Sequence, residues 1–389
     1  MRVPSAPLVL GIAILFGIAL GSQLPTTAPA AEPAAADFAT FTRDESPLIR
    51  RQLQVSDREY RQIEPTLWHL AQRYHGTLVG LPASQRLDRL VGLADFIERL
   101  RDTHADEIVI GEGQRLLGLL DPDRGLDPKE VTTIAAAYGA PATVWKQGAG
   151  GPTGPATNAD TAEGFLAAVR AAAADTTPTT IVVLGHGLPT EIQSYSIPCE
   201  TLAAAFLDGV AGNAGAGDGD AGTQPPERAA RPVDLGHLAL VCDDCFSADF
   251  LENLGAALEE QCQERALDLV ALPTCIAGTN RDRYGIADVG EKFVPHFWKD
   301  VIELYYVRRP LPNAVVLADF FESVDNMMYG YGRTPVVEGG KVVTYRLVNP
   351  DLVQDPVVFV SLDDAELVRL RTILGLPPDA PLPRLFDIG

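Results

Sequence analysis

The chain has 389 residues, of which 46% are hydrophobic, enough to bury a sizeable core in one large domain or in two. Its 52 acidic and 31 basic residues give a net charge of −21 at pH 7. So acidic a chain is a poor partner for nucleic acid or for an anionic membrane surface, and we expect neither.

The first 36 residues have the composition of an export signal or N-terminal anchor followed by a linker. Arg2 precedes an apolar run at 8–20, and the next charge is Glu32. Small residues at 28–30 and 34–36 suit a cleavage site, and the apolar run is short for a spanning helix. We expect export with cleavage, to a secreted, periplasmic or cell-surface location. An uncleaved anchor is the alternative, and only then would the chain contact a membrane.

Residues 37–105 show the pattern of a helical N-terminal region. Apolar side chains recur at helical spacing over 60–70 and again over 87–100, which predicts about three helices. The short run 106–111 predicts the first strand of a following α/β domain.

Strands and helices then alternate, which predicts an α/β fold with a mostly parallel sheet covered by helices on both faces. We assign this domain to 106–348, with a disordered Gly-, Asp- and Pro-rich insertion at 209–232 and a C-terminal extension at 349–389. After 106–111, the expected elements are helix 127–138, strand 142–146, helix 158–174, strand 181–184, helix 199–208, strand 238–241, a helix from 247, strand 267–274, helices 290–304 and 312–328, and a hairpin at 336–347 turning at Gly339-Gly340.

No segment carries a cofactor motif. The glycine-rich stretch 148–157 lacks the Lys-Ser/Thr pair of a P-loop and the dinucleotide fingerprint, and it predicts a flexible rim loop. His69 and His75 have no second pair of ligands nearby, so we expect packing or surface roles for them. We expect neither a metal nor a cofactor.

A reactive thiol is predicted in the stretch LALVCDDCFSADF at 238–250. An apolar strand is followed by Asp243, Asp244 and Cys245, and Ser247 is placed to cap the next helix. A thiol between a strand end and a helix N-terminus is favoured as thiolate, the nucleophilic form. Cys242 is the competing nucleophile, but its place inside the strand predicts burial.

A base for that thiol is predicted in the stretch IVVLGHG at 181–187, where a second apolar strand ends in His186, 59 positions before Cys245. Two parallel strands ending at one edge would bring imidazole and thiol together in the crevice above the sheet. His237 lies before the cysteine strand, at its opposite end, and His296 falls inside an expected helix, so both are weaker candidates.

These two motifs, an apolar strand ending in His-Gly and an apolar strand followed by an acidic residue, x, Cys, x and Ser, resemble those of the caspase-like cysteine peptidases, the group of caspases, metacaspases, legumains and gingipains. The resemblance covers about 131–335. It implies a caspase-like sheet and an endopeptidase that works through a Cys-His dyad and a thioester acyl-enzyme. Cys245 would be the nucleophile and His186 its acid–base partner, with the N–H groups of Gly187 and Cys245 holding the oxyanion.

The resemblance also implies a specificity. In the related peptidases the residue two before the nucleophile faces the P1 pocket, and here it is Asp243. A carboxylate there favours Arg or Lys at P1, with Asn second, and Asp282 is a candidate for a second acid. Asp244 is expected to face solvent or a neighbouring loop. Two positions depart from the family pattern: residues 275–278 stand where metacaspases carry an Asp, and Ala248 stands where many relatives have Gly.

Two other functions stay open at this point. One is a non-catalytic caspase-like module that binds peptides, and the other is a transpeptidase that uses the same acyl-enzyme. The expected partner in each case is a protein or peptide, and the sequence leaves the oligomeric state open.

Overall fold

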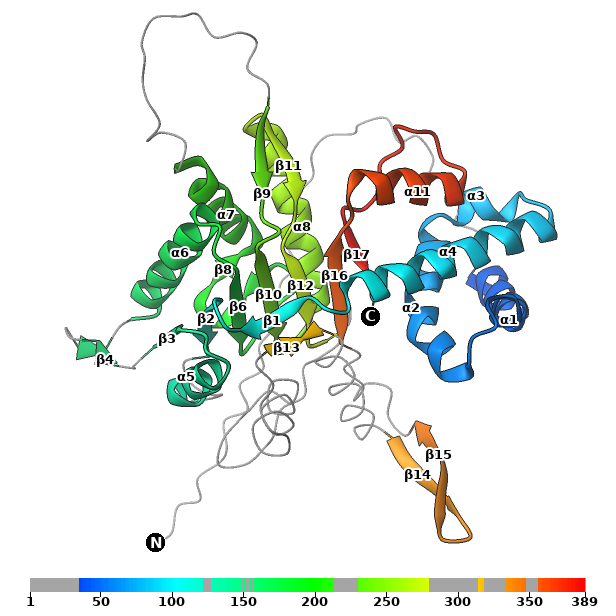
Figure 1. The fold of residues 1–389 in the computed structure, drawn as a ribbon, viewed down its shortest axis with the longest axis horizontal. Coiled ribbons are helices and arrows are strands. Elements are labelled where there is room, and N and C mark those ends of the chain that lie inside the picture. The colour runs from blue at the N-terminus through cyan, green and yellow to red at the C-terminus, as the bar shows by residue number, and fades with distance from the viewer. Residues whose placement is uncertain are drawn as a thin grey trace, which may run out of the picture. The chain divides into compact units, whose positions relative to one another are not determined.

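A computed structural model describes residues 35–121, 127–147, 150–151, 154–155, 157–212, 230–279, 314–317, 333–347 and 356–388. Its contacts divide the chain into two units, Met1–Asp44 and Glu45–Gly389. The second unit is built around a seven-stranded sheet (Figure 1).

The strands of this sheet lie in the order β17-β16-β12-β10-β6-β2-β3. Five are mutually parallel: β2 (Arg115–Leu120), β3 (Ala142–Lys146), β6 (Thr179–Leu184), β10 (Leu238–Asp243) and β12 (Thr274–Ala277). Taken in chain order, these five are arranged 2-1-3-4-5, an order of doubly wound α/β folds. β16 (Val357–Ser361) runs antiparallel to β12, and β17 (Leu385–Asp387) antiparallel to β16. The predicted α/β class with a mostly parallel sheet is confirmed.

Helices α6 (Asn158–Ala174), α7 (Cys199–Gly212) and α8 (Ser247–Glu264) cover one face of the sheet (Figure 1). Alternate strand residues point to this face, so Leu238, Leu240 and Cys242 share one buried cluster with the three helices. Each large apolar side chain buried there stabilises the fold by about 1.5–3 kcal/mol. Thr157 caps α6 through a capping box with Asp160.

The opposite face packs against shorter elements. Gly118 of β2 lies against Val131 of α5 (Pro128–Ala137), whose N-cap is Asp127. Thr180 of β6 donates a hydrogen bond to the carbonyl oxygen of Val109 in β1 (Ile108–Gly111). The sheet is therefore covered on both faces.

The predicted N-terminal helical region is present as α1 (Ala35–Leu53), α2 (Asp57–Arg73), α3 (His75–Val79) and α4 (Ala83–His104). Its apolar stripes are buried as expected, for example at Leu67 and Leu90. Phe96 of α4 packs edge-on against Phe386 of β17, with ring centroids 5.7 Å apart. Arg89 donates to the carbonyl of Ile373 in α11 (Asp364–Leu374) at 2.9 Å. Residues 349–389, expected as an extension, thus supply two strands to the sheet and a helix packed on α4.

Two expected strands are misplaced. The strand at 106–111 is present as β1, but it pairs with β13 (Ala314–Val316) outside the central sheet, and the helix expected at 312–328 is wrong where β13 stands. The strand at 267–274 is β11 (Leu267–Ala271), which pairs with β9 (Arg231–Asp234), whereas the sheet strand β12 begins at Thr274.

The insertion expected at 209–232 is bounded more narrowly, because α7 continues to Gly212 and β9 begins at Arg231. Residues 213–229 lie outside the described residues.

The remaining elements are short. The expected hairpin is confirmed as β14 (Arg333–Glu338) and β15 (Lys341–Leu347), which turns at Gly339 and Gly340, both with positive φ. The others are β4 (Gly150–Gly151), β5 (Gly154–Pro155), β7 (Glu191–Ile192), β8 (Ile197–Pro198) and the 3-10 turn η1 (Gln193–Tyr195). The expected helix at 290–304 lies outside the described residues.

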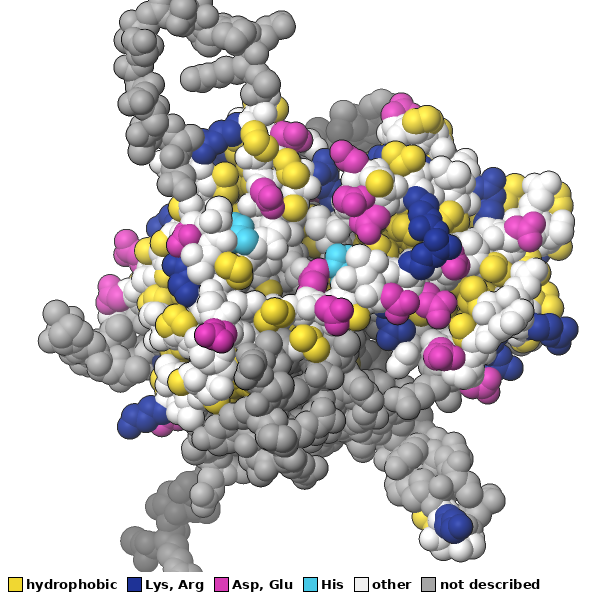
Figure 2. All heavy atoms as spheres, viewed as in Figure 1, with side chains coloured by type: hydrophobic (Ala, Val, Ile, Leu, Met, Phe, Trp, Pro, Cys, Tyr) yellow, Lys and Arg dark blue, Asp and Glu magenta, His cyan; other side chains and the backbone are white. Residues whose placement is uncertain are grey.

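The described surface carries both signs of charge. Figure 2 shows Asp and Glu side chains spread over one face, with Lys and Arg between them. Within the described ranges, no helix is both long and apolar enough to cross a bilayer. The N-terminal run at 8–20 is outside these ranges, so the export signal stays a prediction.

Candidate active site

The carboxyl ends of β6 and β10 bring the two predicted motifs to one edge of the sheet. The strands are parallel neighbours, with Leu184 in register with Asp243. Just beyond them, the N–H of Gly185 donates to the carbonyl of Asp243 at 3.3 Å. His186 and Cys245 therefore leave the sheet from adjacent strands at the edge where open α/β folds place their ligands.

Cys245 differs from the other four cysteines in its exposure. It is half-buried, whereas Cys199, Cys242, Cys262 and Cys275 are buried, as expected for Cys242. Burial raises the pKa of Cys199 and Cys275 to about 12 and that of Cys242 well above its ordinary value. A thiol with such a pKa stays protonated near neutral pH and is a poor nucleophile. None of the five cysteines forms a disulfide, and Cys245 alone among them is not fully buried.

The turn that carries Cys245 is strained and tightly held. Phe246 has φ +57°, a left-handed conformation that is rare for a bulky residue and costs about 1–3 kcal/mol. Phe246 is the N-cap of α8, so the expectation that Ser247 caps this helix is wrong. Ser247 is the first helical residue, and its N–H donates to Thr279 Oγ1 at 3.0 Å.

Thr279, which follows β12, fixes this turn. Its N–H donates to Ser247 Oγ at 2.9 Å, its hydroxyl donates to the carbonyl of Asp244 at 3.0 Å, and its own carbonyl accepts from the N–H of Ala248 at 3.1 Å. Thr279 and Ser247 are both fully buried. Sequence reasoning missed Thr279, although its position after the apolar run of β12 is a usable signal.

The backbone of His186 is held by Ser194 of η1. The N–H of His186 donates to Ser194 Oγ at 3.3 Å, and the N–H of Ser194 donates to the carbonyl of His186 at 3.4 Å. Ser194 in turn donates to Oδ2 of the buried Asp121 at 2.5 Å. Asp121 directly follows β2, and its N–H donates to the carbonyl of Leu184 at 2.9 Å. Asp121 and Ser194 were not predicted from the sequence.

Gly187 is the residue at which the two motifs touch. A Cβ added there would lie 2.3 Å from Asp244 Oδ2 and 2.9 Å from the carbonyl oxygen of Cys245, so only glycine fits. Among the described residues, the N–H of Gly187 donates no hydrogen bond. A buried N–H without an acceptor, beside a nucleophile, suits an oxyanion-binding role.

Both acids before the cysteine are buried. Asp243 is 1% exposed and lies against Gly278, where an added Cβ would be 2.6 Å from Asp243 Oδ1. Asp244 is 2% exposed, so of the two expected environments it has the neighbouring loop and not solvent. Burial, and then the adjacent Asp243, raise the pKa of Asp244 well above its usual range. Asp282 lies outside the described residues, so its substrate-binding role stays a prediction.

Of the two rival histidines, His237 lies at the opposite end of β10 from Cys245. His237 precedes the first residue of β10, and its Nε2 lies 3.1 Å from the carbonyl oxygen of Ala172. A six-residue strand spans about 20 Å, which separates His237 from Cys245. His296 lies outside the described residues.

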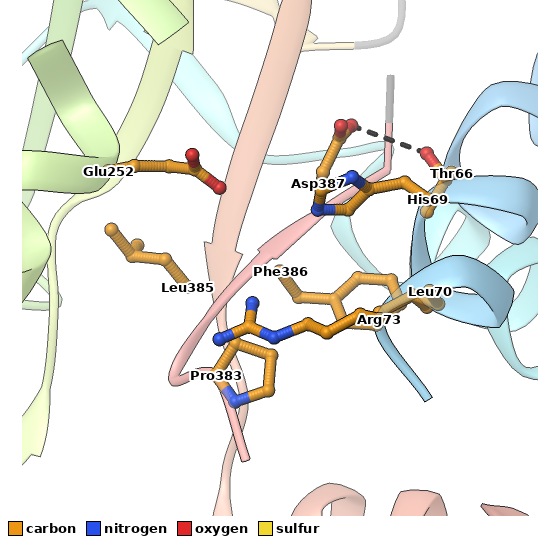
Figure 3. A pocket seen from close by; sticks show the side chains of 9 residues that line it. All are labelled: Thr66, His69, Leu70, Arg73, Glu252, Pro383, Leu385, Phe386 and Asp387. Atoms are coloured by element: carbon orange, nitrogen blue, oxygen red, sulfur yellow. Dashed lines mark hydrogen bonds between the residues drawn. The ribbon is translucent and has the colours of Figure 1, made fainter. Parts of the chain in front are cut away.

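Two adjoining hollows in the described part of the chain lie elsewhere. One, beside His69, Gln72, Arg73 and Glu252, is open and has a volume of about 390 Å³. The other is a cavity of about 10 Å³, room for one water molecule at most. Figure 3 shows its walls, which come from α2, α8 and the segment around β17: Thr66, His69, Leu70, Arg73, Glu252, Pro383, Leu385, Phe386 and Asp387. Its walls carry no thiol, so we take the sheet edge as the candidate site.

The sheet edge therefore holds a half-exposed thiol, a histidine fixed by its backbone, an N–H available to an oxyanion and buried carboxyl groups. Among the described residues, no three His, Cys, Asp or Glu side chains are grouped so as to hold a metal ion. No family model, curated protein or solved structure matches this chain.

Proposed function

We propose that this chain is an exported caspase-like cysteine endopeptidase that cleaves peptide bonds through Cys245 and His186. The observation that carries the proposal is the placement of Cys245, the one cysteine that is not fully buried. Cys245 follows β10 and His186 follows β6. These two strands are adjacent and parallel, so both residues lie at the same edge of the sheet. The resemblance of both motifs to the caspase-like peptidases supports the same assignment.

The reaction would proceed by acyl transfer. His186 takes the thiol proton, and Cys245 Sγ attacks the scissile carbonyl carbon to give a tetrahedral oxyanion. His186 then protonates the leaving amine, the C–N bond breaks, and a thioester to Cys245 remains. Water, deprotonated by His186, attacks the thioester and releases the acid and the thiol.

The surrounding hydrogen bonds support this chemistry by fixing its parts. The N–H groups of Gly187 and Cys245 would stabilise the oxyanion, and one such donor contributes about 3–4 kcal/mol in known hydrolases. Ser194 holds the backbone of His186 on both sides, and Thr279 holds the turn of Cys245. A rigid backbone at both groups reduces the reorganisation needed in the transition state.

We further propose cleavage after Arg or Lys, with Asn as the second choice. Asp243 is the expected selector, because a carboxylate in a desolvated setting prefers a cation or a hydrogen-bond donor. Asp243→Asn should then lose most of the preference for Arg over Asn at P1. An unchanged preference would assign the pocket to another residue.

The test of the function is a positional peptide-substrate screen on matched variants. Cys245→Ala should abolish turnover, and His186→Ala should lower it by about 10²–10⁴-fold. Cys242→Ala is the control: it removes a buried thiol three residues away, should cost about 1–2 kcal/mol of stability and should retain turnover. Peptide binding without cleavage by the wild type would instead favour a binding module, and turnover lost only in Cys242→Ala would mean that the nucleophile is misassigned.

A further inference from the structure

The carboxyl group of Asp244 is an anomaly within the candidate site. Its residue is 2% exposed, and within the part of the chain that the structure describes neither Oδ1 nor Oδ2 has a hydrogen-bond partner. Nearly all buried polar groups in proteins are paired, so a buried carboxyl group with two unpaired oxygens needs an explanation. The proposed chemistry does not use it.

The position of this group is defined from both sides. Its Oδ2 lies against Gly187, so closely that a Cβ there would be 2.3 Å away. Its own carbonyl accepts the hydroxyl of Thr279 at 3.0 Å, which prevents the turn from rotating away. The carboxyl group of Asp244 thus fills the space between the loop that carries His186 and the turn that carries Cys245.

The surroundings of the group favour its uncharged form. On its own turn it is flanked by Asp243 and Cys245, and on β10 it lies near Cys242. From α7 it is faced by Cys199, and the loop after β6 brings His186 next to Gly187. Burial and Asp243 both disfavour the carboxylate. An unpaired charge at this place would be far more costly than the neutral acid.

We propose that Asp244 is a positioning residue of the candidate site: as a neutral acid it packs between the His186 loop and the Cys245 turn, and its ionisation drives them apart. The inference rests on the proposed roles of Cys245 and His186 and adds a pH limit to them. Above the pH at which Asp244 ionises, the carboxylate repels the developing oxyanion and draws water between the loops. The site then loses its geometry while the rest of the fold persists.

The experiment compares wild type, Asp244→Asn and Asp249→Asn across pH in three measurements. Infrared spectra follow the carbonyl stretch of a buried protonated carboxyl group. Alkylation by iodoacetamide, mapped to Cys245 by mass spectrometry, follows the thiol. Peptide turnover follows the reaction. Asn keeps the shape of Asp244 without its charge, and Asp249, a half-buried acid in the first turn of α8, is the control for removal of a carboxylate near Cys245.

Wild type and Asp249→Asn should show the protonated-carboxyl band at neutral pH, and Asp244→Asn should lack it. As the band disappears with rising pH, turnover in wild type should fall about tenfold for each pH unit, whereas in Asp244→Asn it should change by less than about twofold over the same range. The alkylation profile of Cys245 should show an inflection at that pH in wild type and in Asp249→Asn only. The absence of the band at neutral pH in wild type would overturn the proposal even if Asp244→Asn did not fold.

Failure of the peptidase assignment is separable from failure of this inference. A wild type without turnover that still shows the band and the alkylation inflection would contradict the proposed function and leave the role of Asp244 intact. Identical turnover and alkylation profiles in wild type and Asp244→Asn would contradict the role of Asp244 whatever the reaction.

Discussion

Glu107 lies at the amino ends of the central strands and Asp244 at their carboxyl ends, and the pKa values of their carboxyl groups are shifted in opposite directions. Glu107 accepts a hydrogen bond from Thr274, the first residue of β12, at 2.8 Å, and its other oxygen pairs with His104 Nδ1. Burial alone would raise the pKa of Glu107, but the hydrogen bonds from His104 and Thr274 lower it below the ordinary value. At the other edge, Asp244 has no such donors and its pKa is raised.

This difference indicates that the two ends of the strands have different roles. The amino ends, called here the amino edge, stabilise the fold, and the carboxyl ends, called here the carboxyl edge, carry the candidate active site. At the amino edge, both carboxyl oxygens of Glu107 are paired, as buried carboxyl groups are in most proteins. At the carboxyl edge, the described residues include an unpaired acid at Asp244, an unused N–H at Gly187 and the left-handed Phe246, on the loops that follow β10 and β6. Strain and unsatisfied groups persist where surrounding structure enforces them, and they cluster at functional sites.

Asp244→Asn should give the largest effect, on the pH dependence of stability. In the folded protein the pKa of Asp244 is raised above its ordinary value of 3.8. The stability that the protonated group contributes is therefore fully present below pH 3.8 and is lost as the pH rises through the pKa of the folded state. Across that window the unfolding free energy of wild type should fall by about 1.4 kcal/mol per pH unit from this group. Urea denaturation at successive pH values should show that slope in wild type relative to Asp244→Asn. Parallel curves for the two proteins would contradict the raised pKa.

Gly187→Ala should come next, because it forces a methyl group onto Asp244 Oδ2 and the carbonyl of Cys245. We expect a loss of about 3 kcal/mol in unfolding free energy, together with loss of turnover. Gly76→Ala is the control, since an added Cβ there meets nothing within 4 Å and should be neutral or slightly stabilising. Equal stability of the two variants by thermal denaturation would mean that the two loops are not in contact.

Glu107→Gln should remove the ion pair with His104 and lower the unfolding free energy by about 1–2 kcal/mol. The partial exposure of Glu107 limits the size of this loss. The raised pKa of His104, due first to its hydrogen bond with Glu107, gives stability that is present below 6.5 and lost as pH rises through the folded value. The lowered pKa of Glu107 gives stability that is present above 4.5 and lost as pH falls through the folded value. The loss of unfolding free energy in Glu107→Gln should therefore be greatest between pH 4.5 and pH 6.5. Calorimetry with the exposed Glu112→Gln as control would reveal it, and a loss that does not vary with pH would count against the pair.

Ser361→Ala and Ser194→Ala should have the smallest effects on stability. Ser361→Ala removes one hydroxyl that accepts a backbone N–H and should cost about 1 kcal/mol. Ser194→Ala should cost about 1–2 kcal/mol, because it also removes the hydroxyl that donates to the buried Asp121. Ser361, at the amino edge, accepts from Leu272 at 3.2 Å, and Ser194, at the carboxyl edge, accepts from His186 at 3.3 Å. Only Ser194→Ala should lower kcat with KM little changed, and Ser194→Thr should restore part of it. Equal kcat in the two alanine variants would show that the backbone clamp on His186 does not matter for turnover.

Much of the sheet could be predicted from the sequence, because β6 and β10 are uninterrupted apolar runs that end abruptly at polar residues. β2 could not, since its Leu-Leu-Gly-Leu-Leu core suits a buried helix as well as a strand. The missed strand also concealed Asp121, which follows it. Thr279 and Ser194 were missed for another reason: they act through hydrogen bonds to loops that are distant in the sequence, and such contacts leave no periodic pattern in the sequence.

The seating of β17 against the N-terminal helices has a consequence for how the chain folds. Thr66 of α2 donates to Asp387 at 3.3 Å across 321 positions of sequence, and Phe96 packs on Phe386. Contacts between such distant positions require closure of a very long loop, which slows folding. Helices α2 and α4 can form early, but the part of their apolar surface around Phe96 remains uncovered until β17 arrives, and during that interval this surface is open to chaperones or to aggregation.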